Sequence, residues 1–322
     1  MTPQSVNAYL ALWSETEGGT ATLINLSENH TFRIDLTSGE RFILRVHRPG
    51  YQSAASIDSE LEWVAALRAD TDLPVPLALP GRDGRLVQQL VPQGGAPRFA
   101  VLFAFEPGSE PQPAGDLAAL FETLGRFAAI AHNQAATFQP SAGFARQVWT
   151  AGAILDPNGL WGDWRKAPRV SGAIATTLEA LDSRLRLELA DYGRSAGNFG
   201  LIHADMRLAN ILVDGEQVTL IDFDDCGFCW FMYDFAAAIS FFEDGPQIPA
   251  LRARWLAGYA RVRPLPPADL AIIDTMILLR RMALLAWIGS HHETGLARAH
   301  AKDFARVTAQ LAAPYLALKP AP

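Results

Sequence analysis

The chain has 322 residues, of which 49% are hydrophobic and 19% are charged, and its formal net charge is −7. This composition indicates a globular protein long enough for two domains, or for two lobes that share a cleft, and the acidic balance argues against a nucleic-acid-binding surface. The first residues contain no basic region followed by an apolar stretch, no apolar run approaches the roughly 18 residues of a spanning helix, and two cysteines cannot build a disulfide framework. We therefore expect a cytoplasmic protein that binds neither membranes nor nucleic acid, in an oligomeric state that the sequence leaves open.

The N-terminal region has the pattern of an antiparallel sheet. After an expected helix at Val6–Trp13 come three strand-like segments, Ala21–Leu26, Thr31–Leu36 and Arg41–His47. In the second and third of them, apolar residues recur at every other position, at Phe32, Ile34 and Leu36 and at Phe42, Leu44 and Val46. Such alternation is typical of half-buried strands. The polar turn Ser27–His30 joins the first two segments, so we expect three consecutive antiparallel strands here.

The third of these strands carries one cation, Arg45, among apolar neighbours. An arginine stays charged and can grip a phosphate or a carboxylate through two hydrogen bonds. The next segment, Ser53–Arg68, has apolar residues at helical spacing and contains the acids Asp58, Glu60 and Glu62. From these residues alone, an outward-facing Arg45 and a solvent-exposed Glu60 remain open.

Two further strands and a break follow the predicted helix. Arg85–Val91 predicts a fourth strand, and the continuous apolar run Phe99–Phe105 predicts a buried fifth one. Glu106-Pro107-Gly108 then interrupts the chain sharply, as expected of a hinge between lobes. We place the boundary there, with an N-terminal lobe of residues 1–105 and a C-terminal lobe of residues 106–322.

The C-terminal lobe is mainly helical in pattern. Its segments with helical spacing are Leu117–Gln134, Ile174–Tyr192, Arg252–Arg261 and Leu270–Ile288. Residues 140–170 are rich in Gly, Pro and Trp, and we interpret them as an irregular insertion that could form one wall of an acceptor pocket.

Several residues that could carry chemistry have simpler interpretations. His132 lies on a core-facing helix, where a structural role is favoured over a catalytic one. Cys226 and Cys229 are spaced as in a redox or zinc motif but lack its context, which favours simple packing. The run His291–Glu293 could be a metal cluster, yet adjacent histidines point apart on a helix, so a polar helix end is favoured.

The strongest local pattern is a β-hairpin. Two short apolar runs, Ile211–Val213 and Val218–Ile221, flank Asp214-Gly215, which supplies the positive φ angles of a tight turn. Polar residues lie just outside the hairpin. They are His203, Asp205 and Asn210 before it, and Asp222, Asp224 and Asp225 after it.

A hairpin brings the chain that enters it and the chain that leaves it to the same end. We therefore expect Asp205, Asn210 and Asp222 to converge. Two carboxylates and a carboxamide suit Mg²⁺, which takes oxygen ligands and often shares them with phosphates. Phosphoryl transfer needs such a metal ion and a carboxylate near the acceptor hydroxyl.

The spacing His203-x-Asp205-x₄-Asn210, followed after the hairpin by Ile-Asp222-Phe-Asp-Asp, resembles the catalytic and metal loops of the kinase fold. It is most similar to the aminoglycoside phosphotransferase / choline kinase / homoserine kinase group, because Ala204 and Asp224 stand where protein kinases usually have Arg and Gly. This resemblance implies an α+β, two-lobed protein-kinase-like fold. A small N-terminal lobe, an antiparallel sheet plus a helix, would clamp the nucleotide, and a larger, mainly helical C-terminal lobe would hold the catalytic and acceptor-binding parts.

The resemblance also implies an ATP-binding site with Mg²⁺. Arg45 would steady the phosphates in place of the usual Lys, and Glu60, with Glu62 as the alternative, would position it. The turn that contains Ser27 and Asn29 would cover the phosphates.

The same resemblance implies the roles of the catalytic loop. Asp205 would orient and deprotonate the acceptor hydroxyl, and His203 would support the loop. Asn210 and Asp222 would hold Mg²⁺. Asp234 could cap the helix that begins near it, but the resemblance implies that it accepts backbone N–H bonds from the catalytic loop.

The expected activity is transfer of the γ-phosphoryl group of ATP to a hydroxyl of a small molecule, such as an amino alcohol, an aminoglycoside or a sugar-like acceptor. A bacterial Ser/Thr protein kinase of the same superfamily would use the same residues and is the main alternative. A nucleotide-binding pseudokinase is a weaker one, because Asp205, Asn210 and Asp222 are all present. The roles of Asp224 and Asp225 stay open.

Overall fold

The structure is a computed structural model that describes residues 1–26, 29–92 and 94–318. The chain forms two compact units. The first consists of Met1–Ser109, Phe138–Arg146 and Leu212–Asp224, and the second of Glu110–Thr137, Gln147–Ile211 and Asp225–Pro322. Two later segments thus return to the N-terminal unit, and each unit is described separately below.

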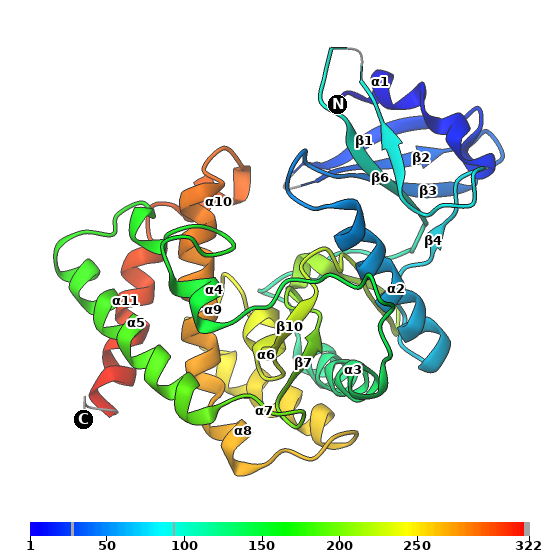
Figure 1. The fold of residues 1–322 in the computed structure, drawn as a ribbon. Helices are drawn as coiled ribbons and strands as arrows, with labels where there is room; N and C mark the ends of the chain where they lie inside the picture. The colour runs from blue at the N-terminus through cyan, green and yellow to red at the C-terminus, as the bar shows by residue number, and fades with distance from the viewer. Residues whose placement is uncertain (27–28, 93, 319–322) are drawn as a thin grey trace. The chain divides into compact units, whose positions relative to one another are not determined.

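The first unit is built on a six-stranded antiparallel sheet in the order β1-β2-β3-β6-β4, with β5 also paired to β6 (Figure 1). Its strands are β1 (Thr20–Leu26), β2 (His30–Asp35), β3 (Arg41–Val46), β4 (Ala78–Leu79), β5 (Gln88–Leu90) and β6 (Arg98–Ala104). The five predicted strands are confirmed, although β5 is shorter than expected. The short strand β4 was not predicted, because two residues carry no alternation.

The two faces of this sheet have different partners. One face forms a core with the N-terminal segment, which includes Val6, Leu10 and Trp13. The opposite face packs against α2 (Ala54–Asp70). The predicted helix at Val6–Trp13 is wrong in its extent, because the segment folds as α1 (Pro3–Asn7) followed by two short 3₁₀ turns.

The predicted hairpin is present as β8 (Ile211–Asp214) and β9 (Gln217–Leu220), and Gly215 at its turn has a φ of 60°. From Leu212 onward it belongs to the first unit. Its anchors there are backbone hydrogen bonds: Ser109 and Val213 donate to each other's carbonyl oxygen at 3.0 Å, and the Leu220 amide donates to Pro74 O at 3.0 Å.

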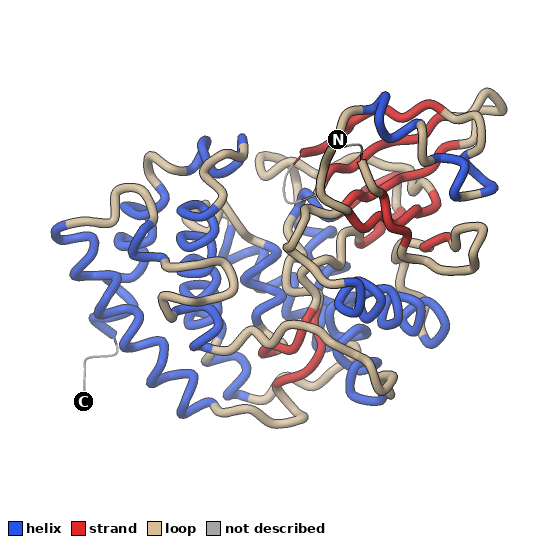
Figure 2. The backbone as a smooth tube through the Cα atoms, turned by 45° about the horizontal axis from the view of Figure 1, so that its top comes forward, coloured by secondary structure: helices blue, strands red, loops and turns tan. Residues whose placement is uncertain are grey.

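The second unit is mainly helical, as the helices drawn in blue in Figure 2 show. Its helices are α3 (Ala118–Thr137), α4 (Ala151–Leu155), α5 (Gly172–Tyr192), α6 (Tyr233–Ala238), α7 (Ile248–Ala260), α8 (Pro267–Ala271), α9 (Ile273–Ser290), α10 (Gly295–His300) and α11 (Phe304–Leu318). Helix α9 contacts α4, α5, α6, α10 and α11 and is therefore the centre of this unit. In the described part of the chain, no helix combines the length and the apolar character needed to cross a membrane.

A two-stranded sheet in the second unit was not predicted. β7 (Phe199–Ile202) pairs with β10 (Gly227–Trp230) in antiparallel register. This pairing joins the segment just before the loop His203–Asn210 to the segment that follows Asp222–Asp225 in sequence. Cys226 and Cys229 are buried beside this sheet and are not joined in a disulfide bond, as the packing interpretation expected.

Helices α3 and α7 approach each other through glycines. A Cβ atom placed on Gly125 would lie 1.9 Å from Trp255 O, and one on Gly258 would lie 1.8 Å from Glu122 O. Real Cβ contacts are essentially never this short, so the two helices can pack this closely only because both positions are glycine. Close packing of this kind leaves no room for even one methyl group.

Candidate active site

The alternation of β3 determines which side of the sheet Arg45 faces. Leu44 and Val46 belong to the core on the N-terminal side of the sheet. Since successive side chains of a strand point to opposite faces, Arg45 faces the side that packs on α2. A charged residue inside this apolar strand is thereby directed toward a helix that carries carboxylates.

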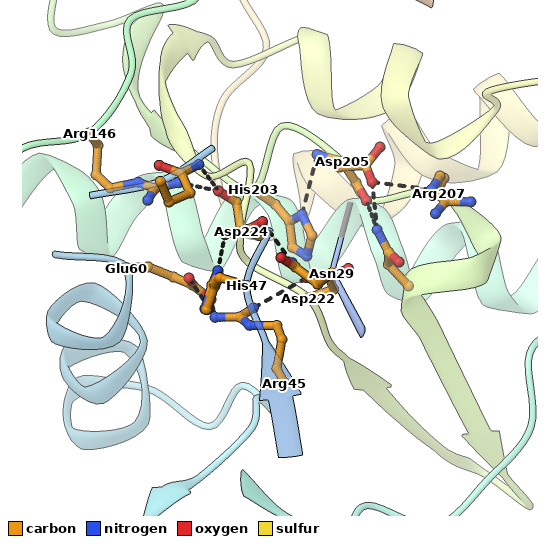
Figure 3. A network of polar contacts seen from close by, with 12 residues as sticks. Asn29, Arg45, His47, Glu60, Arg146, His203, Asp205, Arg207, Asp222 and Asp224 are labelled. Atoms are coloured by element: carbon orange, nitrogen blue, oxygen red, sulfur yellow. Dashed lines mark hydrogen bonds and ion pairs between the residues drawn. The ribbon is translucent and has the colours of Figure 1, made fainter. Parts of the chain in front are cut away.

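Arg45 forms a buried ion pair with Glu60 of α2 (Figure 3). The Arg45 Nη2 atom lies 2.8 Å from Glu60 Oε1 and 2.7 Å from Oε2. Burial alone would lower the pKa of Arg45, but the nearby carboxylates, Glu60 foremost, raise it, so this residue remains a cation. The alternative partner, Glu62, instead accepts hydrogen bonds from the Ser141 amide and hydroxyl.

Asp222 and Asp224 follow the hairpin in the first unit and differ sharply in their surroundings. Asp222 has a side chain that is 44% exposed, and its Oδ1 lies 3.3 Å from Arg45 Nη1. Asp224 is buried and accepts a hydrogen bond from Asn29 Nδ2 at 2.9 Å (Figure 3). Burial would raise the pKa of Asp224, but Arg45, and after it His47, lower it, so the carboxylate stays ionised.

The backbone of Asp224 is also held within the first unit. Its carbonyl oxygen accepts hydrogen bonds from Arg146 Nη2 and Gln52 Nε2. Three segments therefore meet at Asp224. Asn29 comes from the turn after β1, and Arg45 and His47 come from β3 and its end. Ser27, which was predicted to bind nucleotide beside Asn29, lies outside the described residues.

In the second unit, Asp205 is surrounded by cations and an amide. Its Oδ2 accepts hydrogen bonds from Asn210 Nδ2 at 2.7 Å and from Arg207 Nε at 3.1 Å, while Oδ1 accepts one from Arg280 of α9. Burial would raise the pKa of Asp205, but Arg207 and then Arg280 lower it. Asp205 is therefore an ionised carboxylate with a fixed orientation.

Asp234 holds the loop that precedes Asp205. Its Oδ1 accepts a hydrogen bond from the Ala204 amide at 2.8 Å, and its Oδ2 accepts one from the His203 amide at 3.3 Å. These are the backbone bonds expected of Asp234. They support a strained segment, because Ala204 has a φ of 65°, a value that non-glycine residues rarely adopt.

His132 has the structural place that the sequence favoured. Its Nε2 lies 3.0 Å from Asp234 Oδ2 and its Nδ1 lies 3.0 Å from the Tyr259 hydroxyl. A carboxylate can only accept, so Nε2 carries the proton and Nδ1 accepts from Tyr259. Burial lowers the pKa of His132, which keeps the ring neutral beside Asp234.

The predicted metal ligands lie in different units. Asn210 is in contact with Asp205, and both of its hydrogen bonds there, to the Asp205 carbonyl and carboxylate, use Nδ2. Neither bond uses its amide oxygen, which is the atom of a carboxamide that binds metal ions. Asp222 belongs to the first unit, so its convergence with Asn210 and Asp205 stays a prediction.

His291–Glu293 is a polar helix end. His291 is buried and stacks on Trp287 with ring centroids 5.1 Å apart, whereas the side chain of His292 is 80% exposed. Among the described residues, no group of three or more His, Cys, Asp or Glu side chains could hold a metal ion.

Among the residues of these networks that sequence reasoning missed are Arg207, Arg280 and His47. Arg280 stands with Arg281 in an otherwise apolar helix, and this pair of charges was the available signal. Arg207 lies two positions after Asp205, inside the motif itself. His47 gave no signal, because a histidine at the end of a strand is common on any sheet.

The antiparallel sheet unit and the helical unit that carries the loop His203–Asn210 together define a kinase-like fold of the α+β class, which solved structures share. The fold class is confirmed by a solved aminopropanol kinase, described as microcompartment-associated, which superposes with a TM-score of 0.90. That protein is 38% identical to this chain, and the match covers 97% of each. A spectinomycin phosphotransferase, 12% identical over 97% of this chain and 98% of its own, shares the fold with a TM-score of 0.65.

Residues 20–265 match the model of the phosphotransferase enzyme family, and the chain belongs to this family. Among curated relatives, the amicoumacin kinase of Bacillus subtilis is 26% identical over 80% of this chain and 76% of its own length. The homoserine kinase of Gluconobacter oxydans is 27% identical over 77% of this chain and 75% of its own length. The expected family and the expected enzyme class, a kinase, are therefore confirmed.

Proposed function

We propose that this protein transfers the γ-phosphoryl group of ATP to the hydroxyl of a small amino alcohol. The observation that carries the proposal is the fixed, ionised Asp205 in a strained loop that Asp234 holds through backbone amides. Phosphoryl transfer demands little covalent chemistry of the protein, so a carboxylate that orients the acceptor hydroxyl and takes its proton is the main catalytic part.

The residues of the first unit fit a nucleoside triphosphate. Arg45 is a buried cation whose Nη1 reaches toward the exposed carboxylate of Asp222, and Glu60 keeps it in place. We assign to Arg45 the role of binding the phosphates, and to the turn with Asn29 the role of covering them. The buried bond between Asn29 and Asp224 would restrain that turn.

Each of the two predicted metal ligands carries an oxygen of the kind that a hard divalent cation binds. Asp222 offers an exposed carboxylate and Asn210 an amide oxygen, and oxygen ligands of this kind, completed by phosphates and water, are what Mg²⁺ takes. We assign Mg²⁺ to these two residues. When bound, the ion would neutralise phosphate charge. Asp205 keeps its own role of holding the acceptor hydroxyl and receiving its proton.

An amino alcohol is the acceptor class that the relatives favour. The solved aminopropanol kinase and the curated homoserine kinase are both named for acceptors that combine an amine with an alcohol. Asp225, which is half-buried and belongs to the second unit, would supply negative charge that suits an amine. The alternative, a protein as the phosphate acceptor, is one of the outcomes that the test below can distinguish.

The test is Mg-ATP consumption by the purified protein against a panel of amino alcohols, aminoglycosides, sugars and a generic protein substrate. The product is identified by ³¹P NMR, and Asp205→Asn is the blank. Phosphorylation of one amino alcohol, lost in the variant, supports the proposal. Phosphate transfer to the protein substrate alone would overturn the acceptor assignment, and wild-type turnover by Asp205→Asn would remove Asp205 as the base.

A further inference from the structure

Helix α9 contains two adjacent buried arginines. Arg280 is 1% exposed and Arg281 is 2% exposed, in a helix whose other buried residues are almost all apolar. A buried charge is costly unless it is paired and hydrogen-bonded. Each of these arginines therefore has partners that compensate for its burial, and the two sets of partners differ.

Arg281 links elements of the second unit that lie outside the catalytic loop. Its Nη1 lies 2.6 Å from Glu243 Oε2, and its Nε lies 2.9 Å from Thr308 Oγ1 of α11. Its Nη2 donates to Phe304 O at 3.2 Å. These contacts join α9 to α11 and to the segment after α6, which is a structural role.

Arg280 contacts the catalytic loop. Its Nη2 donates to Asp205 Oδ1, its Nη1 donates to Ala204 O at 3.2 Å, and its Nε donates to Ser240 Oγ at 3.0 Å. The guanidinium also lies 5.2 Å from the centre of the Trp161 ring. Each nitrogen of this guanidinium has a partner inside the protein and the residue is 1% exposed, so we assign Arg280 to contacts within the protein and not to substrate phosphates.

We propose that Arg280 is a positioning residue for the phosphoryl transfer, which fixes the Asp205 carboxylate and the strained backbone of Ala204 in their working geometry. This inference rests on the proposed function and adds a residue that acts through Asp205. It identifies the charged residue of α9 that serves the reaction and separates it from its structural neighbour.

The backbone of Ala204 shows why two clamps are needed. A residue at φ 65° relaxes toward negative φ unless its surroundings prevent this. Asp234 holds the amide of Ala204 and Arg280 holds its carbonyl, so both peptide groups that flank the strained Cα are fixed. Loss of either clamp would allow the loop to relax and would move Asp205.

The carboxylate of Asp205 is held in the same way. Arg280 holds Oδ1, while Asn210 and Arg207 hold Oδ2, so the plane of the carboxylate cannot rotate. Arg207 and Asn210 belong to the catalytic loop itself and move with it. Arg280 comes from a separate, central helix, and it is therefore the contact that fixes the carboxylate relative to the rest of the unit.

The experiment compares Arg280→Met and Arg280→Lys with Arg281→Met and Arg281→Lys. All four change a buried arginine at adjacent positions of the same helix, so their effects on folding are matched. Since small misplacement of a catalytic group can cost about 10²-fold in rate, we expect Arg280→Met to lower kcat by about that factor with an unchanged KM for ATP. Arg280→Lys should recover part of the loss, and the Arg281 variants should keep kcat while losing thermal stability.

A double variant tests whether Arg280 acts through Asp205. In the Asp205→Asn background, Arg280→Met should cause no further loss of the residual rate, measured in single turnovers at high enzyme concentration, whereas independent effects would multiply. Multiplying effects, or a kcat loss in Arg281→Met equal to that in Arg280→Met, would overturn the proposal.

Crystal structures of Arg280→Met and Arg281→Met give a readout that does not depend on turnover. We expect Asp205 to change its rotamer, and Ala204 to leave positive φ, only in Arg280→Met. An unchanged loop in that variant would overturn the proposal even if the wild-type protein phosphorylated no acceptor in the panel. Absence of wild-type turnover together with a displaced loop in Arg280→Met would instead overturn the proposed function and leave the positioning contact established.

Discussion

A single nitrogen of Arg45, Nη2, contacts both carboxylate oxygens of Glu60, at 2.8 and 2.7 Å. The pair joins a strand to a helix 15 positions further along the chain and is almost fully buried. Because Nη2 is used by Glu60, Nη1 is directed to the exposed Asp222. The cation is thus oriented by one carboxylate toward the residue that we assign to the metal ion.

Removing the charge of Arg45 should weaken nucleotide binding. We expect Arg45→Met to raise the Kd for Mg-ATP by about 10- to 100-fold, the value of one or two hydrogen bonds to a charged group. Arg45→Lys should lose less, because an ammonium at this position still meets the phosphates. Isothermal titration calorimetry on both variants measures the effect.

The control is Arg33→Met on the neighbouring strand β2, where the side chain is 39% exposed and pairs only at the surface with Asp35. This variant should bind Mg-ATP as the wild type does. Equal affinities in Arg45→Met and Arg33→Met would place Arg45 outside the nucleotide site.

Asp234→Asn should impair the catalytic loop without a change in side-chain size. The N–H groups of Ala204, His203 and His132 all converge on the carboxylate, and an amide offers only one oxygen to them. One donor would then face another donor, which costs about 1–3 kcal/mol of stability. We expect kcat to fall while the KM for ATP stays the same, measured by steady-state kinetics and thermal unfolding.

Asp269→Asn provides the matched control for that variant. Asp269 is also buried in the second unit and accepts a hydrogen bond from the Tyr192 hydroxyl at 2.6 Å, away from the catalytic loop. It should lose some stability and keep kcat. If both variants lost kcat alike, the effect of Asp234 would be one of folding alone.

The contribution of His47 to the stability should fall below pH 6.5. Burial, aided by the charge of Arg45, lowers the pKa of His47 to about 3, while in the unfolded chain it titrates near its ordinary value of 6.5. The unfolded state therefore binds more protons between these pH values, and the contribution of His47 to the free energy of unfolding is lost as the pH falls through 6.5. At pH 5 the loss is about 2 kcal/mol.

Denaturant unfolding between pH 8 and pH 5 checks this sign and size. His47→Gln should remove part of the pH dependence. His292→Gln, which changes a histidine whose side chain is 80% exposed, should leave it intact. The prediction concerns the difference between the wild type and His47→Gln, because the raised pKa of buried Glu60, about 7, acts with the opposite sign over the same pH range. An identical pH dependence in the wild type and in His47→Gln would contradict it.

The contact between α3 and α7 should not tolerate a methyl group. Gly258→Ala would place a Cβ atom 1.8 Å from Glu122 O, so the two helices must move apart. Overpacking of this kind costs about 1–3 kcal/mol, which thermal unfolding would detect. Gly295→Ala at the start of α10, where the added Cβ meets no described atom within 4 Å, should leave the stability unchanged.

The local elements of this protein follow from its sequence because they depend on near neighbours. The alternation in Phe32 and Ile34 predicts a strand, and Asp214-Gly215 between two apolar runs predicts the hairpin. The motif from His203 to Asp222 predicts the family, because a loop of fixed length keeps its residue types and their spacing, and both can be read directly in the sequence.

The local pattern failed where pairing decides the structure. The strands β7 and β10 each have four residues and form only because they pair with each other across 24 intervening positions (226 − 202 = 24). Nothing within either segment indicates this. The helix predicted at Val6–Trp13 was too long, because the chain beyond α1 forms two 3₁₀ turns. Leu10 and Trp13 in this segment pack on the sheet.

The sequence by itself determined the residue types that phosphoryl transfer needs and their order along the chain. Only the tertiary structure decided which charges meet. Arg280 contacts Asp205, which lies 75 positions away in the sequence, and Arg45 pairs with Glu60 and not with Glu62. Which residues of a strand or helix face each other depends on how the elements pack. The physical reason is that a buried charge is stable only beside its partner, and that partner is set by packing between distant segments.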